Sequence, residues 1–238
     1  MFLILFQVIV QTISSTLQWF GFYVGVRSSV GTNSRRWPWV IGSAIVFAAW
    51  LVGTITLAAN NFFDSEVFSS RVPAAMAITL AIGYLLLLSN SFRGIIAAIP
   101  QHWLIGIQAF RVLGGLFLVR YFQGSLPGLF AIPAGLGDLL TGILAPLVAY
   151  WWYTGKPFAR NAAIAWNLLG IADLVNAVVM RSLSDANGFV FPIVMIPVYA
   201  VPRAFLIHSY SLIGLFGKTS RPPEPGEALY HRVELAER

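Results

Sequence analysis

The sequence predicts an all-α integral membrane protein, a bundle of seven transmembrane helices with its N-terminus outside and its C-terminus in the cytoplasm. Composition is the first reason, because 58% of the 238 residues are hydrophobic and only 10% are charged, whereas soluble domains carry about 25% charged residues. The second reason is that the charges separate long apolar stretches, each close to the roughly 20 residues that cross a bilayer. This composition excludes a soluble enzyme, a disordered protein and a nucleic-acid-binding module.

The positions of the charged residues define the expected spans in order. No charge precedes Arg27, and none lies between Arg36 and Asp64. The third uncharged stretch runs from Arg71 to Arg93. Later spans are separated by short loops with the glycine, proline and charge that are typical of helix breakers. The seven expected spans are residues 2–26, 38–60, 73–91, 101–122, 126–153, 161–183 and 189–216, which together form one transmembrane domain over residues 1–217.

Three segments need an interpretation of their own. Residues 2–26 lack the positive start and the small-residue cleavage site of a signal peptide, so we expect a retained first span. Residues 91–100, SFRGIIAAIP, fit an interfacial helix as well as a continuation of the third span. Residues 218–238 combine prolines with mixed charge, which is typical of a short, disordered cytoplasmic tail.

The lysines and arginines near the span ends predict the orientation. Three of them lie on one side, namely Arg71, Arg120 and Arg181. The opposite side holds Arg27, Arg35, Arg36, Arg93, Lys156, Arg160, Lys218 and Arg221. Because cytoplasmic loops carry an excess of positive charge, we expect this richer side to be cytoplasmic. The expected location is a plasma membrane, specifically the inner membrane of a bacterium.

Four charged residues are expected inside the bilayer at similar depth, and they are Arg111, Asp138, Asp173 and Arg203. An ionised side chain at the bilayer centre costs roughly 2.5–3.5 kcal/mol on insertion scales, so such residues face the bundle interior and pair. Two arginines and two aspartates sum to zero charge, as a buried network requires. Arg111 with Asp138 and Arg203 with Asp173 is one pairing. The reverse pairing is equally compatible, because the sequence gives depth but not direction around a helix.

Uncharged polar residues extend this cluster at helical spacing. Gln108 lies three residues before Arg111, and Asn176 lies three residues after Asp173, so each pair shares a helical face. His208 adds an imidazole, whose charge changes near neutral pH. The candidates for ligand binding or proton relay are Gln108, Arg111, Asp138, Asn167, Asp173, Asn176, Arg203 and His208.

A stripe of polar residues on the first span is also expected to face inward: Gln7, Gln11 and Gln18, with Ser14 and Ser15 between them. Buried polar side chains have two roles that the sequence does not separate. They can form a functional site, or they can only hold helices together, at about 0.6 kcal/mol per hydrogen bond. Both interpretations stay open for the stripe and for the four charges.

The fifth and seventh spans are expected to be irregular. Pro133 lies in the fifth, and Pro192, Pro197 and Pro202 lie in the seventh. An interior proline removes a helix hydrogen bond, and non-helical backbone at membrane depth occurs only where it is buried in protein or lines a cavity. The prolines therefore predict broken helices around a cavity. A kinked, closely packed helix, with glycines that admit its neighbours, is the alternative.

No cofactor and no metal site are predicted. The chain contains no cysteine, its histidines lack metal-ligand spacing, and no hydrolase or phosphate-loop motif occurs. Rhodopsins share the seven-span topology, but their retinal requires a lysine deep in the last span. Lys156 and Lys218 both lie at span ends, so neither is placed to hold retinal.

Three functions remain open, and we weigh them by class. The first is a small transporter or binding protein that holds or translocates a small polar solute or a proton at the charged core. The second is a non-catalytic subunit or assembly factor of a membrane complex, whose charges lock the bundle. The third is a membrane-embedded enzyme on a lipid-like substrate, so enzymatic activity is left undecided. The expected partners are the lipid bilayer, a small polar ligand and a membrane-protein partner, without nucleic acid.

Overall fold

The computed structural model describes residues 2–63, 68–184 and 191–217, and every regular element within these ranges is helical. The expected tail at 218–238 lies outside the described residues. The elements are α1 (Phe2–Ser29), α2 (Asn33–Ala59), α3 (Phe68–Leu86), α4 (Asn90–Ala97), α5 (Gln101–Gly106), η2 (Ile107–Gly114), α6 (Gly115–Phe122), α7 (Gly128–Tyr153), α8 (Ala159–Leu183), η3 (Ile196–Ala200) and α9 (Val201–Phe216).

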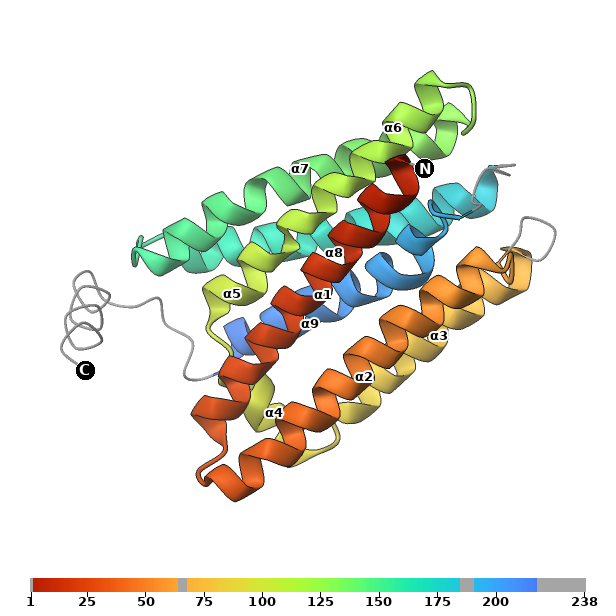
Figure 1. Ribbon diagram of the computed structural model, residues 1–238. Coiled ribbons are helices and arrows are strands. Elements are labelled where there is room, and N and C mark those ends of the chain that lie inside the picture. The colour runs from red at the N-terminus through yellow and green to blue at the C-terminus, as the bar shows by residue number, and fades with distance from the viewer. Residues whose placement is uncertain (1, 64–67, 185–190, 218–238) are drawn as a thin grey trace.

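The helices form an elongated bundle, with α2 and α3 on one side, α5 to α8 on the other, and α1 and α9 between them (Figure 1). Helix α7 packs against α5, η2, α6 and α8. Its buried face is rich in small residues, such as Ala131, Ala134, Gly135 and Ala145. Small residues let helix backbones approach closely, which is how helices associate without a hydrophobic driving force between them.

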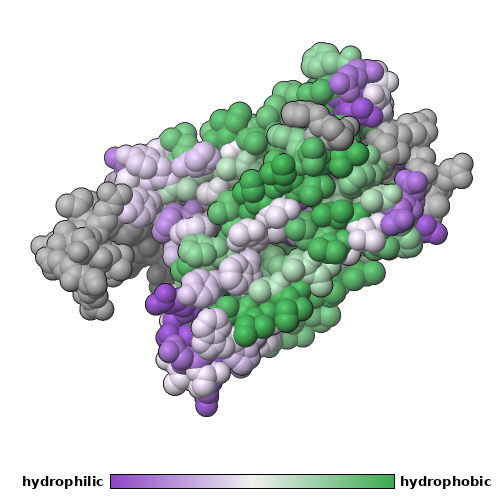
Figure 2. All heavy atoms as spheres, viewed as in Figure 1, coloured by the Kyte–Doolittle hydropathy of each residue, from purple (hydrophilic) through white to green (hydrophobic). Residues whose placement is uncertain are grey.

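Five of the helical segments are long and apolar enough to cross a bilayer: residues 3–29, 33–59, 101–122, 128–153 and 159–183. The bent pair of α3 and α4 makes a sixth if it is counted as one span. One face of the molecule is hydrophobic over its middle and hydrophilic toward its ends (Figure 2). These features are compatible with a membrane protein.

The segment 91–100 contains a separate short helix. Helix α4 is bent by 95° from α3. It begins after Ser89, whose side chain accepts a hydrogen bond from the backbone N–H of Phe92. Phe92, Ile95 and Ile96 are buried, and α4 packs against α1. It therefore crosses the end of the bundle and does not prolong α3.

The irregular backbone lies partly where the prolines predicted it and partly elsewhere. The expected break in the fifth span is wrong, because α7 continues as an α-helix through Pro133 and Pro146. The break lies in the preceding range, 101–122, where η2 is an eight-residue 3₁₀ helix between α5 and α6. Gly114, the last residue of η2, and Gly115, which follows it, have no side chain, so Asp138 and Leu139 of α7 can approach the backbone closely.

The last range is irregular, as its prolines predicted. A five-residue π-helix, η3, precedes the 16-residue α9. Pro202 has no N–H to give to the carbonyl four residues earlier, so one hydrogen bond of the α-helical ladder is missing where η3 meets α9. Single π-helical turns of this kind occur inside α-helices, frequently at functional sites. Arg203 follows immediately after Pro202.

Candidate functional site: two buried arginines

Arg111 lies on η2, whose three-residue period places Gln108, Arg111 and Gly114 in one line along the helix. All three are buried. This line faces α7 and α9, since Gly114 abuts Asp138 and the Gln108 amide nitrogen donates to the Ala204 carbonyl at 2.9 Å. The 3₁₀ geometry is thus the local reason why the guanidinium points into the bundle.

The Arg111 guanidinium holds both buried aspartates. Its Nε donates to Asp138 Oδ1 at 2.7 Å, and its Nη2 lies 2.7 Å from the same oxygen. Nη2 also donates to Asp173 Oδ2. Nη1 donates to the Gly170 carbonyl and to His208 Nε2, both at 3.1 Å. Each of the three guanidinium nitrogens therefore donates at least one hydrogen bond here.

The contact with Arg111 determines the protonation of His208. A guanidinium has no acceptor, so His208 Nε2 accepts and the ring proton is on Nδ1. Nδ1 then donates to Asn167 Oδ1 at 2.9 Å. The Asn167 amide nitrogen donates to Ser211 Oγ at 2.8 Å, and Ser211 also accepts from Gln101. His208 is therefore neutral within a chain of hydrogen bonds that converges on Ser211 from His208 and Asn167 on one side and from Gln101, at the start of α5, on the other.

Glycines make room for this cluster. A Cβ at Gly137 of α7 would overlap the Asp173 carboxylate, and a Cβ at Gly114 would overlap the Asp138 side chain. The close approach of η2, α7 and α8 brings the carboxylates within reach of one guanidinium. The glycines that were expected to admit neighbouring helices have this role at the charged core.

Arg203 is buried in different surroundings. Its donors bind neutral oxygens, and its guanidinium lies 3.9 Å from the centroid of the Tyr199 ring. The acceptors are the Tyr199 carbonyl at 3.0 Å, Ser15 Oγ at 2.8 Å, Gln18 Oε1 at 3.0 Å, Gln11 Oε1 at 2.8 Å and Ser14 Oγ at 3.1 Å. The polar stripe of α1 therefore faces inward, and all of its members except Gln7 bind this arginine. Among the described residues, no carboxylate contacts it.

The expected pairings are corrected accordingly. Arg111 pairs with Asp138, as one of the two pairings proposed. Arg203 pairs with neither aspartate among the described residues, because its side chain is directed to α1, and Asp173 binds Arg111 instead. Asn167 is buried and joins the chain from His208. Asn176 is only half-buried and makes no hydrogen bond within the described residues.

Several participants were not among the residues singled out from the sequence. Ser211 lies three residues after His208 on the same face of α9, a spacing that would have indicated it. Tyr199 lies four residues before Arg203, and its hydroxyl contacts Ser15 Oγ at 2.6 Å. Trp166 packs on His208 with ring centroids 4.8 Å apart, and a tryptophan in an apolar span gives no signal of such a role.

Space beside the charged core is small. A cavity of about 20 Å³ is bordered by Gln11, Arg111, Gly114 and Asp138. A water molecule needs roughly 10–15 Å³ of such volume, so this space fits one water. Within the described residues, no group of three or more His, Cys, Asp or Glu side chains is arranged to hold a metal ion.

Comparison with known proteins places the chain in a family. Residues 68–216 match the family described as "Domain of unknown function (DUF8737)", and the chain belongs to this family. The matched range contains all eight candidate residues, including both arginines and both aspartates. No curated protein and no solved structure is significantly similar to the chain.

We expect Arg111→Met to destabilise the protein by about 3–5 kcal/mol, because it leaves two buried carboxylates without their partner. Thermal unfolding in detergent measures the effect. Arg27→Met is the matched control, since Arg27 is exposed at the end of α1. Adding Asp138→Asn and Asp173→Asn to Arg111→Met should restore part of the loss. An Arg111→Met protein as stable as the wild type would contradict the central role of this guanidinium.

We expect Gly137→Ala to lower the unfolding temperature, because its Cβ collides with the Asp173 carboxylate. Gly53→Ala is the control, since a Cβ there meets nothing within 4 Å and alanine favours a helix by about 0.5–1 kcal/mol over glycine. The double variant Gly137→Ala/Asp173→Ala should lose less stability than the sum of its single changes. Additive losses would show that the two residues are not in contact.

Proposed function

We propose that this chain is a seven-span membrane protein that binds a proton or a small polar solute in its charge-paired core and passes it across the bilayer. Of these two occupants, the geometry favours the proton. The seventh crossing would be formed by the irregular segment η3 and α9. We further propose a plasma-membrane location, the inner membrane of a bacterium, with the arginine-rich ends in the cytoplasm.

The observation that carries the proposal is the unequal charge around Arg111. One guanidinium contacts two carboxylates, and His208 is neutral because it accepts from Arg111. The directly bonded group therefore has one negative charge in excess when both aspartates are ionised. Arg203 contacts neither carboxylate among the described residues. A proton on Asp138 or Asp173 removes the excess, and buried ionisable residues in membranes commonly serve as proton relays.

The size of the adjoining space supports a proton over a larger solute. The cavity beside Asp138 has room for one water molecule. A water there would border the amide of Gln11, whose nitrogen has no hydrogen-bond partner among the described residues. It could bring a proton to Asp138, whereas an organic solute would require the helices to separate.

A second function has an observation in its favour. Because every guanidinium nitrogen of Arg111 donates a hydrogen bond and both carboxylates are paired with it, the network suits a purely structural role. Such a role fits a non-catalytic subunit or assembly factor of a membrane complex. The two functions differ in what neutralising one aspartate does.

The test is proton flux into liposomes that contain the purified protein and an enclosed pH-sensitive dye. Under an imposed pH gradient with potassium and valinomycin, we expect the wild type to dissipate the gradient at least about ten times faster than Asp138→Asn or Asp173→Asn. Asn176→Ala is the control, since this side chain makes no hydrogen bond in the described residues. Unfolding temperatures are measured for every variant.

Either of two results would reject proton passage. One is a wild type no faster than empty liposomes. The other is an Asp138→Asn variant with wild-type flux. If Asp138→Asn also lowers stability and the protein is extracted in a stable larger complex, the subunit function replaces the proposal.

The proposed orientation has its own test, which the absence of native cysteine makes simple. We expect Gln123→Cys, in the exposed turn after α6, to react with a membrane-impermeant maleimide on intact cells. Ser34→Cys, at the exposed start of α2, should react only after the cells are permeabilised. Labelling of Ser34→Cys from outside would reverse the orientation.

A further inference from the structure

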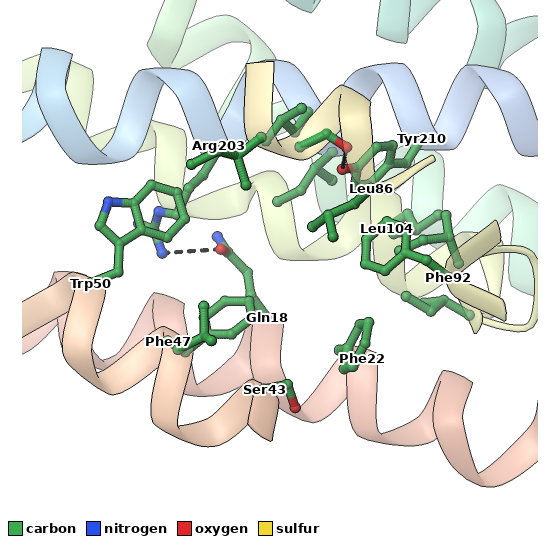
Figure 3. A pocket seen from close by; sticks show the side chains of 18 of the residues that line it. Gln18, Phe22, Ser43, Phe47, Trp50, Leu86, Phe92, Leu104, Arg203 and Tyr210 are labelled. Atoms are coloured by element: carbon green, nitrogen blue, oxygen red, sulfur yellow. Dashed lines mark hydrogen bonds between the residues drawn. The ribbon is translucent and has the colours of Figure 1, made fainter. Parts of the chain in front are cut away.

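A second and much larger cavity is bordered by Arg203. Its volume is about 700 Å³, within the roughly 300–1,000 Å³ of known ligand pockets. Helix α2 packs against α1, and α3 packs against α9. The cavity lies between these two pairs, with α4 and α5 closing one end (Figure 3).

The walls of this cavity are apolar and aromatic. Side chains labelled in Figure 3 that form them include Phe22, Phe47, Trp50, Phe92 and Leu104. Such a lining cannot replace the hydration shell of a polar solute, but it suits a hydrocarbon chain. The proton site around Arg111 does not use these residues.

The cavity opens to the outside of the bundle between α2 and α3. Val46 of α2 and Ile78 and Ile82 of α3 border the cavity, and they are 62%, 60% and 55% exposed. Apolar residues that are exposed at this depth of a membrane-spanning bundle face lipid. A molecule dissolved in the bilayer therefore has a lateral route between α2 and α3.

One end of the cavity is polar and positively charged. Arg203 and Gln18 border it there, joined by the hydrogen bond drawn in Figure 3. Arg203 binds only neutral oxygens in the described residues, so its charge has no direct counterion. The Gln18 amide nitrogen is buried and has no acceptor among them. A buried cation beside an unused donor is the arrangement that an anionic group would complete.

We propose that this cavity binds an amphiphile from the bilayer, with its hydrocarbon chain along the aromatic walls and its anionic headgroup at Arg203 and Gln18. The shared chemistry of the ligand is an apolar chain with one carboxylate or phosphate. A free fatty acid and an anionic membrane lipid both have this chemistry. The proposal is independent of proton passage, because the two sites use different arginines.

Binding is measured with the full chain in nanodiscs of zwitterionic lipid, using dibrominated stearate as the probe. Bromine quenches tryptophan fluorescence at short range, and Trp39, Trp50 and Trp103 border the cavity. We expect saturable quenching by the acid. The matching brominated alcohol, which lacks the charge, should bind at least tenfold more weakly.

Gly21→Leu tests the location. Gly21 is buried and borders the cavity, yet a Cβ there would meet nothing within 4 Å, so a leucine side chain can enter the empty space. We expect at least tenfold weaker binding of the probe. Gly53→Leu, on the exposed face of α2 away from the cavity, should bind like the wild type.

Gln18→Glu tests the charge. It places a carboxylate beside Arg203, which should weaken binding of the acid at least tenfold while the unfolding temperature stays level or rises. Gln123→Glu, at an exposed position, is the control for added negative charge. Because neither variant removes Arg203, loss of binding is not confused with loss of folding.

Native mass spectrometry of the gently extracted protein separates the two sources of ligand. A retained fatty acid or a retained anionic phospholipid, absent from Gly21→Leu, supports the proposal and identifies the headgroup. Equal binding of acid and alcohol would overturn it. So would wild-type quenching in Gly21→Leu, or quenching that does not saturate.

Discussion

The packing of the bundle around its charged core depends on the guanidinium of Arg111, in which every nitrogen donates a hydrogen bond. Arg111 binds oxygen acceptors of α7 and α8 and the imidazole of His208 on α9. In a bilayer, apolar surfaces gain little by leaving lipid for one another, so close packing and polar contacts decide how helices associate. Gly114 and Gly137 lie where any side chain would prevent the carboxylates from reaching Arg111.

The two arginines show two ways of keeping a cation away from water. Arg111 is paired with two carboxylates, which together carry one negative charge more than its guanidinium neutralises. Arg203 is solvated by amides, hydroxyls, a carbonyl and an aromatic face, mostly from a single helix, α1. The first arrangement leaves a negative charge that a proton can cancel, and the second leaves a positive charge that an anion can cancel. The core thus contains one site with an excess negative charge and another with a positive charge that has no direct counterion.

The sequence predicted which charged residues are buried. It did not predict which of them pair with one another. Apolar length and rare charge located Arg111, Asp138, Asp173 and Arg203, because charges within apolar stretches are costly enough to be conspicuous. Their connections depend on direction around each helix. In the range 101–122 that direction differs from the one expected for an α-helix, because the range contains a 3₁₀ stretch. No proline within this stretch indicates it in the sequence. Pro133, which looked like a break, is accommodated within a continuous α7.

The 3₁₀ stretch also links the charged core to the dimensions of the membrane. A 3₁₀ helix rises about 2.0 Å per residue and an α-helix about 1.5 Å, so the eight residues of η2 make this segment about 4 Å longer than a uniform α-helix would be. Winding η2 into an α-helix would shorten the segment and turn Arg111 around its axis in the same movement. A span that does not match the bilayer thickness is met by tilting, by kinking or by a local change in the bilayer, so the length that η2 adds bears both on this match and on the direction of the Arg111 guanidinium.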